Sequence, residues 1–334
     1  MKKYSQLQLE RKSLKDIIPL STPFGLFIDP TNWCNFHCSF CPRNQDDFST
    51  FAGKFCHMSY ELFEKIVNDI KQFPERLKVI RLYYLGEPLL NKNFIKMFAY
   101  LCKENICDRI EVTTNGSLLT NDKADALLKA ARTFVGNIYF RFSIYGIDGG
   151  GYKRIVKNAV DPLNIMHNIK YLFDAKQGAD NIFLYAKKLA TYDDEDETFY
   201  KMFKPICDEV NLEMPMNWSG AEEKNLLKEA FSESQLRKVP KKKIPKACSY
   251  PFTNLAVNSD GTVVICCVDW SRGTLVGNVN ENSLVDIWNG EPLKRIRRLH
   301  LDGKRSEISS CKNCMQLPLD ERDSLDDVSS KILE

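Results

Sequence analysis

Cys34, Cys38 and Cys41 lie within eight residues of one another at the spacing C-x3-C-x2-C, so that all three thiolates could face one point from a single loop. Soft sulfur ligands of this kind select iron–sulfur clusters or zinc. A structural zinc site would need a fourth Cys or His nearby, and His37 inside the segment is the available residue. Three thiolates on a [4Fe-4S] cubane would instead leave one iron open for a substrate or cosubstrate, which is a catalytic arrangement.

Four more cysteines form a second set further along the chain: Cys248, Cys266, Cys311 and Cys314. Their spacing is C-x17-C, a gap of 44 residues, and C-x2-C. Four thiolates can close the coordination of a cluster or of a structural zinc without an outside ligand. We therefore expect two separate sulfur sites, one open and one closed.

Cys267 follows directly on the expected ligand Cys266. If both residues lie on a strand, their side chains point to opposite faces, so Cys267 is not a further ligand of the same site. It is either a buried thiol or a hydrogen donor that faces the active site. The remaining cysteines read as buried small hydrophobic residues, and three histidines as core or surface residues: Cys56, Cys102, Cys107 and Cys207, and His57, His167 and His300.

Short apolar segments alternate with amphipathic ones up to about residue 213, which is typical of parallel βα units. The expected strands are 26–28, 79–85, 110–113, 138–143, 182–186 and 210–213. The expected helices begin at Ser59 and cover 93–104, 122–132, 162–175 and 198–207. Six such units could form a doubly wound sheet or an incomplete barrel, and the periodicity does not distinguish them.

The sequence changes character after Trp218. A polar helix is expected over 222–228 and a basic linker, punctuated by prolines, over 237–246. Beyond the linker, 254–257 and 263–266 flank the turn Asp260-Gly261 and indicate a β-hairpin, followed by a helix over 284–299.

The overall composition excludes several classes of protein. The chain has 334 residues, 43% hydrophobic and 27% charged, with a net charge of +3, which is ordinary for a globular protein and does not indicate a nucleic-acid or membrane surface. No segment has the length and apolar character of a membrane span, and no signal peptide is recognisable. We therefore expect a cytoplasmic protein in which the twelve cysteines are not a disulfide framework.

The first cysteine segment, placed directly after the first strand, resembles that of the radical S-adenosylmethionine (SAM) superfamily. The resemblance implies a partial (β/α)6 barrel, similar to a TIM barrel, in which Cys34, Cys38 and Cys41 hold a [4Fe-4S] cluster that chelates SAM. It also implies SAM contacts at the ends of later strands: Phe40 near the adenine, Gly86 and Glu87 in Leu85-Gly86-Glu87-Pro88, Thr114 and Asn115, and Ser143 near the ribose. Barrel enzymes build their sites at this face.

The second cysteine set resembles the twitch domain, a half-SPASM module of α+β type that carries one auxiliary [4Fe-4S] cluster. The stretch from Gly277-Asn278 to Trp288-Asn289-Gly290 also resembles that module. The two resemblances imply an N-terminal extension over 1–21, a barrel over 22–235, an auxiliary-cluster domain over 236–321 and a tail over 322–334.

The resemblance implies an enzyme that cleaves SAM reductively, with an electron donor such as flavodoxin or ferredoxin, and abstracts a hydrogen atom from its substrate. The cofactors carry the chemistry and the protein orients the target carbon. The spacing looks most like the twitch dehydrogenases that oxidise a carbocyclic amino-sugar alcohol, so we expect a carbohydrate-like small molecule to be converted to a ketone, with the auxiliary cluster as electron acceptor. About 24 residues precede the first strand, fewer than the leader-binding domain of many peptide modifiers. A sugar epimerase, a peptide-modifying enzyme and a noncatalytic Fe–S or zinc scaffold are the alternatives.

Overall fold

The computed structural model describes residues 12–215, 218, 226–236, 245–312, 314 and 321–333. One nine-stranded sheet runs through the molecule in the order β6-β5-β4-β3-β2-β1-β7-β8-β9. Strands β1 to β6 are parallel, and each pairs with the next in chain order. Their bounds are Gly25–Ile28, Val79–Arg81, Arg109–Thr114, Asn137–Ile144, Ile182–Leu189 and Glu209–Glu213.

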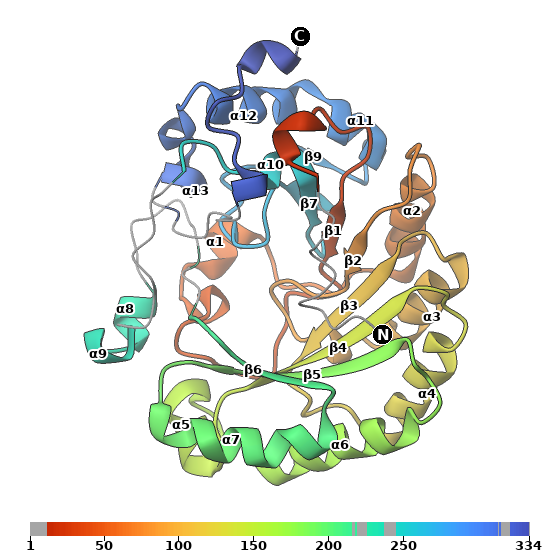
Figure 1. Cartoon of the computed structure of the whole chain (residues 1–334), viewed down its shortest axis with the longest axis vertical. Coiled ribbons are helices and arrows are strands. Elements are labelled where there is room, and N and C mark those ends of the chain that lie inside the picture. Colours follow the sequence, from red (N-terminus) through yellow and green to blue (C-terminus); the bar gives the residue numbers. More distant parts are fainter. Residues whose placement is uncertain are drawn as a thin grey trace.

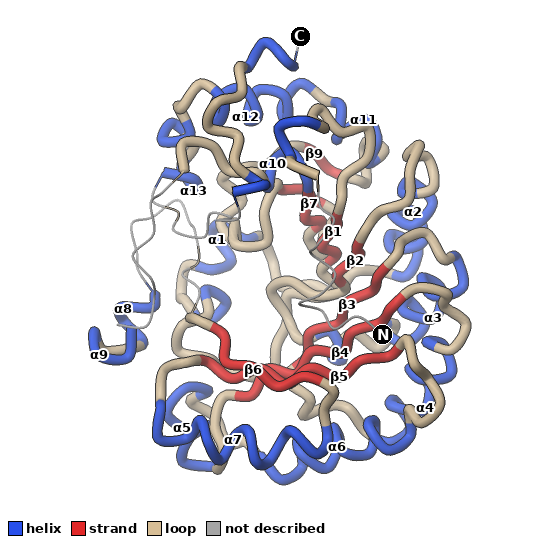
Figure 2. Tube along the Cα trace, viewed as in Figure 1, coloured by secondary structure: helices blue, strands red, loops and turns tan. Residues whose placement is uncertain are grey.

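This parallel part curls into an open arc with helices on its convex side (Figures 1 and 2). Because β6 and β9 end the strand order, the arc does not close, and the partial barrel implied by the sequence is confirmed. The helices of the convex side are α2 (Tyr60–Ile70), α3 (Phe94–Glu104), α4 (Asn121–Ala131), α6 (Pro162–Ala175) and α7 (Asp196–Phe203).

Helix α2 illustrates how the local sequence produces these elements. Ser59 caps it by accepting a hydrogen bond from the backbone N–H of Leu62 at 3.1 Å. Phe63, Ile66 and Val67 lie on one face at helical spacing and are all 0% exposed. Burial of this apolar face against the sheet, rather than helix propensity, holds the helix in place.

The C-terminal part extends the same sheet (Figure 1). Strand β7 (Asn254–Val257) pairs in parallel with β1, and β8 (Thr262–Val264) and β9 (Gly277–Asn278) follow in antiparallel order. Four helices cover this end: α10 (Tyr250–Thr253), α11 (Leu284–Asn289), α12 (Glu291–Leu301) and α13 (Ser309–Lys312). The barrel and the auxiliary-cluster region therefore share one hydrogen-bonded sheet.

Several expected boundaries are wrong. The helix over 284–299 is two helices, because the backbone at Gly290 is extended and Pro292 begins a new turn. Strand β2 ends at Arg81 instead of residue 85, and β8 ends at Val264, before Cys266. Of the polar helix expected over 222–228, residues 226–228 lie in α8 (Leu226–Ala230), and residues 222–225 are outside the described residues. Residues 219–225 and 237–244, which include most of the expected linker, are outside the described residues.

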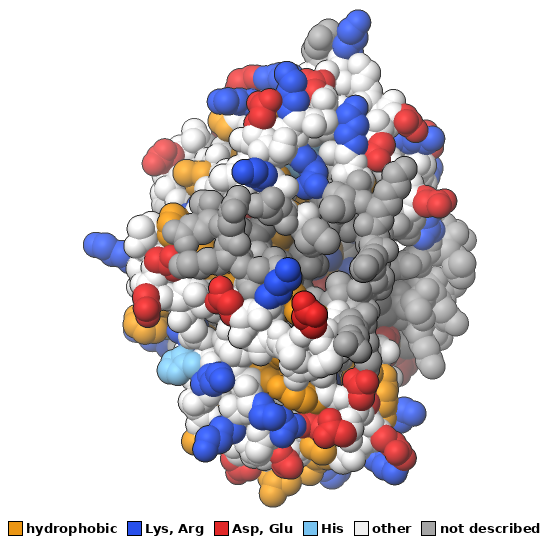
Figure 3. Space-filling model, turned by 90° about the vertical axis from the view of Figure 1, so that its left-hand side faces the viewer, with side chains coloured by type: hydrophobic (Ala, Val, Ile, Leu, Met, Phe, Trp, Pro, Cys, Tyr) orange, Lys and Arg blue, Asp and Glu red, His pale blue; other side chains and the backbone are white. Residues whose placement is uncertain are grey.

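Lys and Arg side chains are mixed with Asp and Glu over the face drawn in Figure 3, in keeping with the nearly balanced charge of the chain. None of the described helices has the length and apolar character needed to cross a membrane.

Candidate functional site

A cavity opens at the carboxyl ends of β1 to β4, where the expected SAM contacts follow the strands. All three cysteines of the first set line it, together with Phe40, Gly86, Glu87, Thr114, Asn115 and Ser143. The structure thus brings every expected residue of the first site to one place. Tyr83, Tyr84, Tyr145 and Trp218 also line this cavity and were not expected from the sequence.

The loop that carries the first cysteine set is fixed by hydrogen bonds to its backbone. The Arg43 guanidinium donates to the carbonyl of Phe36 at 2.5 Å, and the Asn44 amide donates to the carbonyl of Cys38 at 2.9 Å. From the region after helix α5 (Gly149–Val156), Asn158 donates to the carbonyl of Asn35 at 2.9 Å. The loop is therefore held in shape by the protein itself.

The three thiols lie close to one another, with Cys38 buried and Cys34 and Cys41 half-buried, and the environment fits a metal cluster. Burial raises the pKa of Cys34 to about 12 and raises that of Cys38 and Cys41. The guanidinium of Arg43, itself 8% exposed, opposes this rise in all three. Since only the thiolate binds a metal, the site requires a cationic group to keep the sulfurs ionised, which cluster iron supplies.

The arrangement of the thiols also bears on the zinc alternative. Within the described part of the chain, no three His, Cys, Asp or Glu side chains converge closely enough to hold a single metal ion. His37 is exposed on the loop and does not line the cavity. Cysteines placed around a cavity fit a cubane, in which each of the three thiolates binds a different iron, better than one zinc ion.

Glu87 connects the ends of β2 and β3 from a buried position. One of its carboxylate oxygens accepts from the Thr114 hydroxyl at 2.6 Å and from the N–H of Leu89 at 3.1 Å, and the other accepts from the N–H of Asn115 at 2.8 Å. Burial raises the pKa of Glu87, and these hydrogen bonds oppose the rise. The carboxylate retains acceptor capacity toward the cavity, because two carboxylate oxygens can accept about four hydrogen bonds.

Gly86 allows the segment from Leu85 to Pro88 to pack closely against the backbone of the cysteine loop. A Cβ atom at Gly86 would lie 1.9 Å from the carbonyl oxygen of Thr31 and 2.4 Å from that of Trp33. The next residue, Glu87, donates its N–H to the same Trp33 carbonyl at 2.8 Å. Only glycine fits here, because both neighbours are backbone atoms.

Aromatic side chains form one wall of the cavity. Phe40 and Tyr145 have ring centroids 5.9 Å apart, and Phe40 also contacts Phe231 at 5.9 Å. Tyr145 follows β4 and interacts through its hydroxyl with Ser143 and with the thiol of Cys38. Tyr145 lies two residues after Ser143, and side chains two residues apart on an extended backbone point to the same face. This spacing is the signal that could have identified Tyr145 in the sequence.

The second cysteine set lines a separate cavity just after the end of β8, beside α12 and α13. Cys248, Cys266, Cys311 and Cys314 all contribute to it, as do Asp269 and His300. The buried Asp269 carboxylate accepts from the N–H of Thr274 at 2.8 Å, the N–H of Gly273 at 3.1 Å and the hydroxyl of Ser310 at 2.5 Å. It therefore ties the loop after Cys266 to the residue that precedes Cys311.

Cys267 lies beyond the end of β8, so the strand alternation on which its orientation was based does not apply. Its thiol interacts with that of Cys266 and lies near Arg81 and Arg141 on the inner face of the sheet. It does not line either of the two cysteine cavities. Its role as a hydrogen donor stays a prediction.

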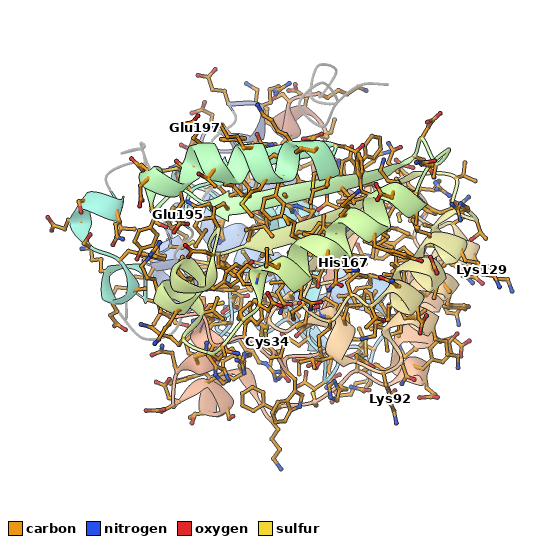
Figure 4. All side chains as sticks on the ribbon, turned by 90° about the horizontal axis from the view of Figure 1, so that it is seen from below. Cys34, Lys92, Lys129, His167, Glu195 and Glu197 are labelled. Atoms are coloured by element: carbon orange, nitrogen blue, oxygen red, sulfur yellow. The ribbon has the colours of Figure 1, made fainter. Side chains whose placement is uncertain are left out.

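Neither cysteine cavity is lined by the other four thiols or by two of the histidines: Cys56, Cys102, Cys107 and Cys207, and His57 and His167. Cys102, Cys107 and Cys207 are buried, as expected, whereas Cys56 is half-buried with its sulfur 3.3 Å from the Ser259 hydroxyl. His167 is exposed on α6, away from Cys34 (Figure 4).

Two family models match the chain at these two sites. The radical SAM superfamily matches residues 28–188, and the SPASM iron–sulfur cluster-binding domain matches 248–315; together they cover about two thirds of the chain. The chain belongs to the radical SAM superfamily and carries a SPASM iron–sulfur cluster-binding domain. A [4Fe-4S] cluster and SAM are the cofactors of the first, and further iron–sulfur binding belongs to the second.

Individual relatives resemble the chain to different extents. The tungsten-containing aldehyde ferredoxin oxidoreductase cofactor-modifying protein of Pyrococcus furiosus is 30% identical over 119 residues, 36% of this chain and only 30% of that protein. The S-adenosyl-L-methionine-dependent 2-deoxy-scyllo-inosamine dehydrogenase of Niallia circulans is 21% identical over 300 residues, 90% of this chain and 95% of that protein. The crystal structure of BtrN in complex with AdoMet and 2-DOIA shares the fold, with a TM-score of 0.56 and 18% identity over 88% of this chain and 93% of BtrN.

Proposed function

We propose that the protein oxidises an alcohol of a carbohydrate-like small molecule to a ketone, with a cluster at the second cysteine set accepting one electron. One observation carries the proposal: a three-cysteine cavity and a four-cysteine cavity are joined through Tyr84. Its ring lines the first cavity, and its hydroxyl donates to the carbonyl of Cys266 in the second at 3.3 Å. The first set leaves a cluster position open for SAM, whereas the second is closed and suits electron transfer.

When bound, the cluster and SAM supply one electron for reductive cleavage and a radical that removes a hydrogen atom from the substrate carbon. Oxidation to the ketone then requires loss of the hydroxyl proton and of one further electron, which the second site receives. Cys34, Cys38 and Cys41 would hold the first cluster and Glu87 the SAM amino group, while Phe40 and Ser143 would contact the adenosine. Cys248, Cys266, Cys311 and Cys314 would hold the auxiliary cluster.

The inner face of the sheet beside the first cavity is polar, which supports a hydroxyl-rich substrate. Arg141 donates to the Tyr83 hydroxyl at 3.1 Å and pairs with Glu213 at 2.8 Å. Lys187 pairs with the same Glu213 at 3.0 Å. Charged and hydroxyl groups of this density suit a ligand rich in hydrogen-bonding groups. The relative from Niallia circulans is named for such a reaction, on a carbocyclic amino-sugar.

The test is anaerobic reconstitution followed by iron analysis and a SAM-cleavage assay with dithionite. We expect about eight Fe per chain in the wild type, from two four-iron clusters. Replacing Cys34, Cys38 and Cys41 by alanine should leave about four Fe and abolish 5′-deoxyadenosine formation. Replacing Cys311 and Cys314 should also leave about four Fe but preserve slow SAM cleavage. Cys56→Ser, at a half-buried thiol outside both sets, is the control and should keep about eight.

SAM cleavage retained in the triple variant would contradict the assignment of the first site. If the second site contains zinc, that site cannot be the electron acceptor. A flavodoxin or ferredoxin is the electron donor we expect in place of dithionite, and the cytoplasm the compartment that supplies it.

An epimerase is the second candidate, because Cys267 lies beside Tyr83, which lines the first cavity. A thiol there could return a hydrogen atom to the opposite face of a substrate radical. Turnover in deuterated water separates the two reactions. Deuterium at an inverted carbon, lost in Cys267→Ser, supports the epimerase; a product oxidised by two electrons without such deuterium supports the dehydrogenase.

A further inference from the structure

His300 is a fully buried imidazole that the proposed reaction does not use. It lies near the end of α12, is 0% exposed, and lines the second cavity together with the four cysteines. Only a core or surface role is expected of it from the sequence, because no motif surrounds it.

One hydrogen bond determines where the proton of this imidazole lies. The backbone N–H of Cys248 donates to Nδ1 of His300 at 3.1 Å. A ring nitrogen that accepts a hydrogen bond has no proton, so the ring is neutral and its proton is on Nε2. His300 therefore offers one N–H donor, at Nε2.

That donor has no partner among the described residues of the protein. A buried N–H without an acceptor is costly, so native structures nearly always provide one. A cluster held by the four cysteines would lie in the cavity that His300 lines, and its sulfides are acceptors that the described residues do not supply. We propose that Nε2–H of His300 donates a hydrogen bond to a sulfur of the auxiliary cluster and raises its reduction potential. This inference rests on the assignment of a cluster to the second cysteine set.

A hydrogen-bond donor to the auxiliary cluster favours transfer of the substrate's electron to that cluster in the proposed oxidation. Reduction adds negative charge to the cluster, and a hydrogen bond to sulfur stabilises the more negative state. Arg305 acts in the same sense, since it lines the cavity and donates to the carbonyl of Cys311 at 2.7 Å. His300 thus makes the second site a better acceptor of the substrate's electron without binding iron.

The first experiment needs no substitution at His300. The full chain with Cys34, Cys38 and Cys41 replaced by alanine is labelled with ¹⁵N-histidine, reconstituted and reduced, so that the auxiliary cluster alone is paramagnetic. Pulsed electron paramagnetic resonance should then detect weak coupling to one ¹⁵N nucleus.

A matched pair of variants separates the donor from the acceptor of the imidazole. His300→Asn keeps an oxygen near the position of Nδ1 for the Cys248 N–H but loses the donor. His300→Gln places an amide N–H near the position of Nε2 but loses the acceptor. The reduction potential of the auxiliary cluster should be more negative in His300→Asn and close to that of the wild type in His300→Gln.

Absence of ¹⁵N coupling in the loaded protein overturns the inference, whether or not the variants fold. A loaded His300→Asn protein with the wild-type potential overturns it as well. Both results require a loaded auxiliary cluster. If the proposed function itself fails, the protein with the first three cysteines replaced contains no cluster at all.

Discussion

Gly86 shows how one missing methyl group allows two loops to form one site. The segment from Leu85 to Glu87 and the cysteine loop touch through backbone atoms, and Glu87 then reaches Thr114 and Asn115. Three strand ends are joined through this point. A side chain there would separate the expected SAM contacts from the first cluster site.

We predict that Gly86→Ala prevents loading of the first cluster. The Cβ would lie 1.9 Å from the Thr31 oxygen, a distance that real Cβ contacts do not reach, so the backbone of one loop must move. Iron analysis should give about four Fe per chain, all at the second site, and no 5′-deoxyadenosine should form. Gly149→Ala is the control, since a Cβ there meets nothing within 4 Å. A Gly86→Ala protein with about eight Fe and full activity would contradict the prediction, because the loops could then move apart without losing the site.

Because Asp29 is buried directly after β1, we predict that the free energy of unfolding depends on pH. Burial raises the pKa of its carboxyl to about 8, against hydrogen bonds that include one from the Leu85 N–H at 3.3 Å. Between about pH 4 and 8 the folded protein holds a proton that the unfolded chain releases, so the free energy of unfolding falls as the pH rises, by at most about 1.4 kcal/mol per pH unit.

Asp29→Asn should remove this contribution, because the amide keeps an acceptor for Leu85 and cannot ionise. The measurement is anaerobic urea unfolding at several pH values in the wild type and the variant. Infrared difference spectra should also show a protonated carboxyl that titrates near pH 8 and is missing from the variant. Equal pH profiles for the two proteins would mean that Asp29 is ionised at neutral pH.

At the scale of elements, loops between short helices and strands carry most of the second site. Cys266 follows β8, Cys311 lies in the four-residue α13, and Cys314 follows it. Short elements of this kind have little stability of their own, so side-chain hydrogen bonds must position the thiols. Asp269 makes these bonds on both sides of the cavity.

Asp269→Ala should therefore reduce loading of the auxiliary cluster. The substitution leaves the N–H groups of Gly273 and Thr274 and the Ser310 hydroxyl without their common acceptor. The variant is best made in the protein that lacks the first three cysteines, where iron reports only the second site. We expect less than half of the iron of the parent protein. Asp302→Asn, at an exposed position after α12, should match the parent; equal iron in both variants would contradict a positioning role for Asp269.

The sequence predicted regular elements well and irregular ones poorly. All six parallel strands were expected within a few residues, because most of them have apolar runs that mark a buried strand, although β6 is only half-buried. The break at Gly290 was missed, since the apolar pattern of α11 continues across it into α12. His300 was missed for a different reason. Its significance comes from a hydrogen bond to the backbone of Cys248, and no spacing along the chain reveals such a contact.

At the scale of the whole molecule, the pairing of β1 with β7 makes the two cysteine regions one structural unit. Gly25 to Ile28 align in register with Asn254 to Val257, and both strands are almost fully buried. Family motifs indicated two modules, but motifs within each module contain no information about which strand of one pairs with which strand of the other. The shared sheet also fixes the relative position of the two cysteine cavities.

We predict that residues 1–236 do not form a stable barrel alone. Without β7, the apolar strand β1 becomes an unpaired edge, which is a site of aggregation. Size-exclusion chromatography and thermal unfolding should show aggregated material without a cooperative transition. Removing only residues 331–334, whose described part lies in a short helix (Ser330–Leu333) and in no strand, should leave the protein monodisperse. A soluble fragment with a cooperative transition would show that the barrel does not depend on β7.

The pairing of β1 with β7 means that β1 gains its second neighbouring strand only late in translation. More than 200 residues separate β1 from β7, so at the usual rate of translation β1 and the first cysteine loop wait on the order of ten seconds or more for their second neighbour. During that time the nascent chain has an open apolar edge and three accessible thiols. Chaperones and the cluster-delivery machinery can both act in this interval, and loading of the second site must follow the translation of Cys314.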